Sequence, residues 1–257
     1  MIRQATESSV ASAQIRGRRD YQEDSLAVQL FAANAGERAN ELLLVMADGM
    51  GGHAGGDVAS RLVVDCFRAA YGSSTEPVPA ALRSSLEAAN ECVADAVQDT
   101  PELRGMGSTL VGCVIRDDGL SWVSVGDSPL WVYRANGLQR LNADHSMVPL
   151  LEAMASSGEL TREELLADPR RSLLRSALTG KNIELVDLSG QPFRLDDGDV
   201  VLLASDGIET LNVAELAGLL QDAGAVTLDE LAGRLLAGVE AAGRINQDNA
   251  SVILYRH

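Results

Sequence analysis

The chain has 257 residues, enough for one large domain with a sizeable buried core. It carries 21 Lys and Arg residues against 37 Asp and Glu residues, and the resulting net charge of −16 argues against binding to nucleic acid or to anionic lipid. Hydrophobic residues make up 46 % of the chain, but its apolar stretches fall far short of the ~20 residues of a membrane-spanning helix. We therefore expect a folded protein that binds neither nucleic acid nor a membrane.

The cysteines and the N-terminal segment predict a cytoplasmic protein. Cys66, Cys92 and Cys113 show no CxxC spacing and have apolar neighbours, so we expect buried thiols with no ligand or nucleophilic role. The first residues lack the apolar core of a secretory signal, and so few cysteines are typical of a reducing compartment.

The first half of the chain predicts a hairpin followed by two helices. Residues 1–13 are small and polar, as in a loose terminus or an edge strand. Two strand-forming runs, Leu26–Phe31 and Leu42–Ala47, flank a turn-forming stretch and predict the hairpin. Apolar residues then recur at helical spacing over Asp57–Tyr71 and again after Pro79, which predicts two helices that each bury one face.

The second half predicts strands and helices in clusters. Three runs rich in β-branched and aromatic residues predict a β-meander: Thr109–Ile115, Leu120–Val125 and Leu130–Tyr133. Residues 147–178 favour helix, with a capping-box pattern from Thr161 to Glu164. The remaining expected elements are strands at 183–188 and 199–204, helices at 213–220 and 227–242, and a final strand at 251–255. Because the elements do not alternate strictly, an α+β fold is favoured over a doubly wound parallel sheet.

Acidic residues stand at the ends of several predicted strands. These positions are Glu23-Asp24, Asp48-Gly49, Gly126-Asp127, Asp206-Gly207 and Asp248-Asn249. An isolated Asp-Gly is typical of a turn. If the sheet topology brings several of these carboxylates together, either protonation or bound cations must relieve their repulsion, and we expect cations. Carboxylate and carbonyl oxygens are hard ligands, so the pattern favours Mg²⁺ or Mn²⁺ over Zn²⁺.

Seven short motifs, in this order and spacing, resemble those of the metal-dependent type 2C protein serine/threonine phosphatases. They are Arg19-Asp20-Tyr21-Gln22-Glu23-Asp24, the glycine-rich segment 48–56, Gly107-Ser108-Thr109, Val125-Gly126-Asp127-Ser128, Asp144-His145-Ser146, Ser205-Asp206-Gly207 and Asp248-Asn249. The resemblance implies a four-layer αββα sandwich, in which two antiparallel sheets lie between pairs of helices. It also implies a single catalytic domain over residues 1–257, with residues 146–175 as a helical flap inserted beside the active site.

The resemblance further implies a site for two Mn²⁺ or Mg²⁺ ions. Asp48 would bridge the ions, the Gly49 carbonyl would ligate one of them, and Asp206 and Asp248 would complete the other. Asp127, together with Asp206, matches a weaker third metal position. Ions ~3.5–4 Å apart acidify a bridging water, so the resulting hydroxide would attack phosphorus in line without a phosphoenzyme.

Other residues have implied roles around the metals. Glu23 and Asp24 would orient metal-bound waters from outside the first coordination sphere. Arg19 would anchor the phosphate, because a guanidinium grips two phosphate oxygens at once. His53 is either the acid that protonates the leaving alkoxide or a turn residue without a chemical role, and the sequence favours neither. The locally basic flap residues Arg170 and Arg171 would steer phosphorylated substrates.

The implied protein is a bacterial stand-alone phosphatase that acts on phosphoserine and phosphothreonine and opposes a serine/threonine kinase. We expect a monomer. Two departures from the family pattern are Gln22, where Asn is usual, and Pro129, where Arg commonly follows Gly-Asp-Ser. Neither departure removes a metal ligand.

Two alternatives belong to other classes. Residues 49–54 fit a dinucleotide-binding pattern, but no second strand with an acidic residue for the ribose follows the helix. A phosphatase-like binding or regulatory module without catalysis is the second alternative. Such a module would be expected to lack some of the metal-binding carboxylates, yet Asp48, Asp206 and Asp248 are all present.

Overall fold

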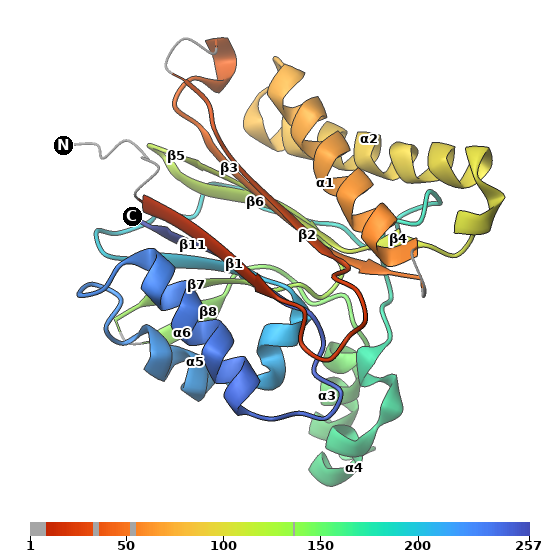
Figure 1. Cartoon of the computed structure of the whole chain (residues 1–257), viewed down its shortest axis with the longest axis vertical. Helices are drawn as coiled ribbons and strands as arrows, with labels where there is room; N and C mark the ends of the chain where they lie inside the picture. Colours follow the sequence, from red (N-terminus) through yellow and green to blue (C-terminus); the bar gives the residue numbers. More distant parts are fainter. Residues whose placement is uncertain (1–8, 33–35, 52–54, 136) are drawn as a thin grey trace.

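The computed structural model describes residues 9–32, 36–51, 55–135 and 137–257. Two β-sheets pack face to face, and a pair of helices covers the outer face of each (Figure 1). Helices α1 (Gly55–Ser73) and α2 (Val78–Asp99) lie on one sheet, and α5 (Val213–Leu220) and α6 (Leu228–Ala241) lie on the other. The expected αββα sandwich is confirmed.

Both sheets are antiparallel. One has the strand order β1-β11-β10-β7-β8, and the other has the order β2-β3-β5-β6-β9 with β4 paired to β3. The strands are β1 (Val10–Ile15), β2 (Asp24–Leu30), β3 (Leu42–Met50), β4 (Gly107–Ser108), β5 (Leu110–Arg116), β6 (Gly119–Val125), β7 (Leu130–Arg134), β8 (Gly137–Arg140), β9 (Asp187–Leu188), β10 (Val200–Ala204) and β11 (Ala250–Arg256).

The apolar strand β3 is buried on both faces. Alternate side chains, among them Val45, pack against the α1/α2 layer. The intervening ones, among them Leu44 and Met46, pack between the sheets against strand residues such as Leu203. Because successive side chains of a strand point to opposite faces, a strand enclosed on both sides must be apolar throughout. Its first polar side chain, Asp48, therefore marks the edge of the core.

The predicted β-meander is wrong. Strands β5 and β6 do pair, but β7 lies in the opposite sheet between β10 and β8. The chain crosses between the sheets at Gly126, whose φ of +104° and close approach to Thr109 leave no room for a Cβ. Strand propensity is the same in either sheet, so the local pattern did not predict the crossover.

Most other predicted elements are confirmed. Strands β2 and β3 form the expected hairpin, and the strand expected at 183–188 shortens to β9. Residues 147–178 contain the helices α3 (Val148–Ser156) and α4 (Arg162–Ala167) and the 3₁₀ turn η4 (Pro169–Ser172). Thr161 and Glu164 form the predicted capping box at α4. Further 3₁₀ turns are η2 (Gly36–Arg38), η3 (Pro101–Leu103) and η5 (Asp206–Thr210).

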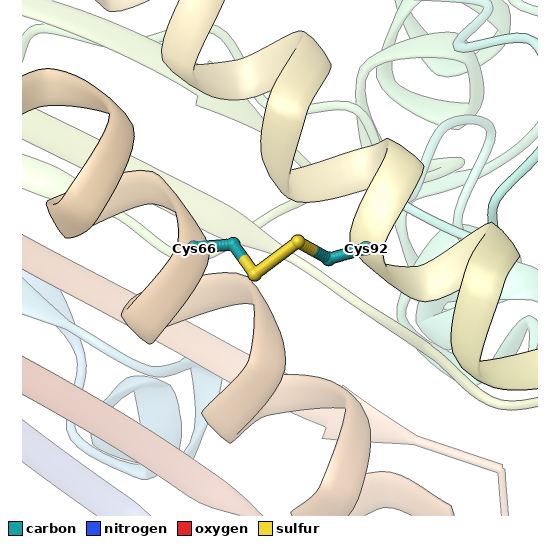
Figure 2. Close-up of a disulfide and its surroundings, with 2 residues drawn as sticks. All are labelled: Cys66 and Cys92. Atoms are coloured by element: carbon teal, nitrogen blue, oxygen red, sulfur yellow. A yellow bond between two sulfur atoms is a disulfide. The ribbon is translucent and has the colours of Figure 1, made fainter.

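The cysteine prediction needs a correction. A disulfide joins Cys66 on α1 to Cys92 on α2, with 6.7 Å between their Cα atoms (Figure 2). Both residues are half-buried where the two helices face each other, an arrangement that a separation of 26 residues in sequence does not reveal. Cys113 is the expected buried free thiol, and burial raises its pKa.

A buried polar cluster ties the β2–β3 connection to the end of α1. Arg38 and Glu41 are each 2 % exposed. The Tyr71 hydroxyl donates to Glu41 at 2.7 Å, and Arg38 donates to the Tyr71 oxygen at 3.1 Å. The Arg38 guanidinium also donates to the carbonyls of Ser74 and Glu76. The buried charges are therefore paired and hydrogen-bonded, as burial requires.

In the part of the chain that the structure describes, no helix is both long and apolar enough to cross a lipid bilayer.

Candidate active site

The acidic strand ends meet at one edge of the sandwich. A pocket of about 470 Å³ there is lined by several of the predicted residues, namely Arg19, Glu23, Asp48, Gly49, Asp127, Asp206 and Asp248. Asp48 and Gly49 end β3 of one sheet, whereas Asp206 follows β10 and Asp248 precedes β11 of the other. The convergence that the sequence left open is therefore present, and it draws on both sheets.

Hydroxyl side chains fix the backbone of Asp48. Its N–H donates to Thr109 Oγ1 at 2.9 Å, and its carbonyl accepts from the Ser108 hydroxyl and the Thr109 N–H, both at 2.9 Å. The Thr109 hydroxyl also contacts Ser128 Oγ at 2.8 Å. The Asp48 backbone is thus held at the mouth of the pocket independently of its carboxylate. The predicted roles did not include Thr109 or Ser128, although both lie in the motifs that carried the resemblance.

Two glycines let three segments approach each other. A Cβ on Gly49 would lie 2.0 Å from the carbonyl oxygen of Gly56, and a Cβ on Gly56 would lie 2.4 Å from Glu23 Oε1. The Gly49 N–H also donates to the Glu23 carbonyl at 3.1 Å. Only glycine fits at position 49, whereas a Cβ at position 56 would displace the Glu23 carboxylate, so the glycine-rich segment places the start of α1 directly against the end of β3.

Asn249 holds the loop that carries Arg19 and Glu23. Its amide nitrogen donates to the carbonyls of Arg16 at 2.8 Å and Tyr21 at 3.0 Å, and its oxygen accepts from the Glu23 N–H at 2.7 Å. The Asp-Asn pair before β11 therefore has two uses: the aspartate faces the pocket, and the asparagine positions the loop opposite.

Asp24 lies behind the pocket and is 5 % exposed. Its carboxylate accepts from the hydroxyls of Ser205 at 2.7 Å and Ser251 at 2.6 Å, so it connects β2 to the end of β10 and the start of β11 in the other sheet. Burial raises the pKa of Asp24 to about 6, although the two hydroxyls oppose this shift. Its position agrees with the predicted role outside the first coordination sphere.

Burial and mutual repulsion raise the pKa values of the clustered carboxyls. Burial, with Asp24 and Asp206 nearby, places the pKa of Asp48 well above its ordinary range. Burial and then Asp206 raise the pKa of Asp127 to about 7, and burial and then Asp248 raise that of Asp206. Each carboxylate is thus costly to ionise without a neighbouring positive charge.

The residues fit hard divalent cations. Within the described residues, Asp206 Oδ1 is a buried carboxylate oxygen without a hydrogen-bond partner. The acidic residues that line the pocket carry carboxylate oxygens, which Mg²⁺ and Mn²⁺ prefer as ligands. No three Asp, Glu, His or Cys side chains of the described chain surround a single ion position. Asp48, Asp206 and Asp248 therefore line one pocket without already surrounding a single ion position.

Arg19 pairs with Asp248 at the pocket rim. Its guanidinium donates to the Asp248 carboxylate, and the two side chains are 50 % and 38 % exposed. The guanidinium therefore stands beside the carboxylates that the sequence predicts to bind metal.

The remaining predicted residues are placed unevenly. His53 lies outside the described residues. Arg170 is engaged by Asp168 through contacts of 2.6–3.2 Å and does not line the pocket. Arg171 faces a neighbouring pocket of about 720 Å³ that shares Asp127 and Asp206 with the first.

Comparisons with known proteins agree with this geometry. The sequence model described as protein phosphatase 2C matches residues 17–230. The serine/threonine phosphatase stp of Listeria welshimeri is 30 % identical over 221 residues, which is 84 % of each chain. The serine/threonine protein phosphatase PstP of Mycobacterium tuberculosis is 37 % identical over 173 residues, 66 % of this chain and 32 % of that protein. The chain thus spans about a third of the mycobacterial relative.

A solved structure of the PstP catalytic domain, in complex with two manganese ions, superposes with a TM-score of 0.77 at 29 % identity and covers 96 % of each chain. The chain thus shares the fold of a metal-dependent phosphatase, and acidic residues from both of its sheets meet in one pocket. The chain belongs to the protein phosphatase 2C family, whose members are serine/threonine protein phosphatases that use Mn²⁺ or Mg²⁺. The relatives described above are bacterial.

Proposed function

We propose that this chain hydrolyses phosphoserine and phosphothreonine on proteins. The observation that carries the proposal is the meeting of Asp48, Asp206 and Asp248 with Arg19 in one pocket. The positive charge of one arginine does not balance the charge of three carboxylates. With divalent cations they become a site for a phosphate monoester.

The proposed metal ligands are Asp48 and Gly49 from one sheet and Asp206 and Asp248 from the other, with Asp127 and Asp206 at a weaker third position. Mn²⁺ or Mg²⁺ held by these residues would lower the pKa of a bound water, and so would make a hydroxide nucleophile available near neutral pH. Ligation also relieves the repulsion that raises the carboxyl pKa values. Glu23 and Asp24 act from outside, and the hydroxyls on Asp24 keep its carboxylate oriented.

Arg19 binds the substrate phosphate. In the structure its guanidinium is held by Asp248, so the two residues exchange partners in use: the carboxylate ligates a cation, and the arginine grips phosphate oxygens. The positions of the cysteines also support a mechanism without a cysteinyl phosphoenzyme. Cys113 is fully buried, and neither Cys66 nor Cys92 lines the pocket, so the cysteines offer no nucleophile to it.

We also propose that residues 1–257 form one catalytic domain with residues 146–175 as its flap. Ser172, at the end of η4, lines both the metal pocket and its neighbour, which supports a role for the flap beside the substrate. Arg171 then contacts the substrate, whereas Arg170 is retained by Asp168. Alanine at 171 should raise the peptide KM, and alanine at 170 should change it little.

The proposed partners are phosphorylated proteins and a serine/threonine kinase that the enzyme opposes, and the proposed state is a monomer in the cytoplasm. The Cys66–Cys92 bond is uncommon for a reducing compartment. Alkylation of thiols in intact cells tests the location: a cytoplasmic protein should show all its cysteines reduced. His53 stays a prediction as general acid, tested by comparing His53→Ala on substrates with good and poor leaving groups.

The deciding experiment is phosphate release from a phosphothreonine peptide by the wild type and by Asp206→Asn, each with Mn²⁺, with Mg²⁺ and with EDTA. Turnover that needs metal and collapses in the variant is the expected result. A folded wild type that binds Mn²⁺ by calorimetry and releases no phosphate would overturn the proposal in favour of a binding module.

A further inference from the structure

Arg140, the last residue of β8, stands beside the metal pocket without lining it. Its side chain is 24 % exposed and forms part of the wall of the neighbouring pocket, together with Asp127, Asp144, Asp206 and Glu209. Four of these five residues are acidic, so Arg140 is a cation set among carboxylates next to the proposed third metal position.

The guanidinium joins three segments of the chain. Its Nη2 donates to the Asp127 carbonyl at 2.6 Å. Its Nη1 lies 3.5 Å from Glu209 Oε1 and 3.6 Å from Asp144 Oδ2. Glu209 belongs to η5, the 3₁₀ turn that begins at Asp206. One side chain therefore connects the backbone of Asp127 to the turn that carries Asp206.

The Asp127 loop is also held from its other side. The Asn142 amide accepts from the Leu130 N–H at 2.8 Å and donates to the Ser128 carbonyl at 2.9 Å. His145 Nδ1 accepts from the Gly126 N–H at 3.2 Å, and the backbone N–H of His145 donates to the Gly126 carbonyl at 3.0 Å. These contacts fix the residues on both sides of Asp127, and Arg140 supplies the bond to Asp127 itself.

The loop has no arginine of its own, because Pro129 occupies the position where the family commonly has one. We propose that Arg140 is a positioning residue that holds Asp127 and the Asp206 turn at the separation required for cation binding between them. The proposal rests on the proposed function only in the identity of the cation site, since the contacts of Arg140 are independent of catalysis.

The test uses Arg140→Met, which keeps the length of the side chain and removes its donors, and Arg140→Lys, which keeps the charge without the fork. Mn²⁺ binding is measured by calorimetry, with Asp127→Asn as the reference for loss of the weaker ion. Partners outside the coordination sphere typically contribute 10–100-fold to metal affinity. We expect Arg140→Met to weaken the weaker ion by about tenfold or more, with a smaller loss in Arg140→Lys.

The matched control is Arg134→Met on the neighbouring strand β7. Arg134 makes comparable ion pairs, with Asp196 and Asp199, at a site that lines neither pocket. Its loss should lower thermal stability and leave Mn²⁺ binding unchanged. The Mn²⁺ concentration for half-maximal activity should rise in Arg140→Met and stay unchanged in Arg134→Met.

Wild-type Mn²⁺ binding in Arg140→Met, or an equal loss in Arg134→Met, would overturn the inference. Calorimetry gives this result even in a protein without turnover, so failure of the positioning role and failure of the proposed activity are distinguishable.

Discussion

Removing the Cys66–Cys92 disulfide should destabilise the protein without touching the pocket. The bond links α1 to α2 across 26 residues. The chain-entropy relation for a loop of that length gives about 12 cal/mol/K, or about 3.5 kcal/mol at 25 °C. Both cysteines are half-buried, so replacement by serine adds little beyond the lost cross-link. The double variant Cys66→Ser with Cys92→Ser should therefore have a free energy of unfolding that is lower by this amount, and it should unfold at a lower urea concentration.

The assay compares urea unfolding of the oxidised wild type, the reduced wild type and the double variant. The m-value should rise when the bond is lost, because the unfolded chain without a cross-link exposes more surface. Alkylation of the unfolded, non-reduced wild type should modify Cys113 alone. Equal midpoints for the oxidised and reduced wild type, or alkylation of three thiols, would refute the reasoning.

Three further predictions concern the glycine contact, the carboxylates and the buried ion pair. Gly49→Ala should cost about 1–3 kcal/mol and abolish metal-dependent activity, because its Cβ meets a carbonyl oxygen at 2.0 Å; full activity would contradict this. The folded state of the metal-free protein binds more protons than the unfolded chain, since the pKa of Asp127 is raised to about 7 and that of Asp24 to about 6. Its free energy of unfolding should thus fall from about pH 4 to pH 7, and bound Mn²⁺ should make this decrease smaller. A melting temperature in EDTA that rises with pH would contradict the prediction. Arg38→Met removes one of the two ion pairs of the buried Glu41 carboxylate and leaves the one with Arg116, so it should cost about 1–3 kcal/mol in urea unfolding, with an unchanged midpoint as the contrary result.

Local patterns predicted most of the fold, and long-range contacts account for what they missed. The apolar runs of β3 and β10 and the capping box before α4 carry their own signals, so these elements were predictable. The sheet to which β7 belongs depends on the crossover at Gly126, and the disulfide depends on how two helices face each other. Neither relation is written in neighbouring residues.

The site divides in the same way. Carboxylates at strand ends, such as Asp48 and Asp206, were identified from the motifs. The residues that hold them were not, because Thr109 and Asn249 act through backbone hydrogen bonds formed only after the chain has folded. Arg170 and Arg171 were predicted together from their charge alone, and the structure distinguishes them because Arg170 is paired with Asp168.

The division of the carboxylates between two sheets has a mechanical consequence. Asp48 moves with one sheet, and Asp206 and Asp248 move with the other. The packing of the apolar layer between the sheets, with Leu44 and Ile253 among its members, therefore sets the distances between these carboxylates. Neither half of the sandwich contains a complete site. Phosphatase activity would thus depend on how the two sheets pack, and a substitution deep in that layer that shifts one sheet along the other would abolish activity without changing any of the proposed metal ligands.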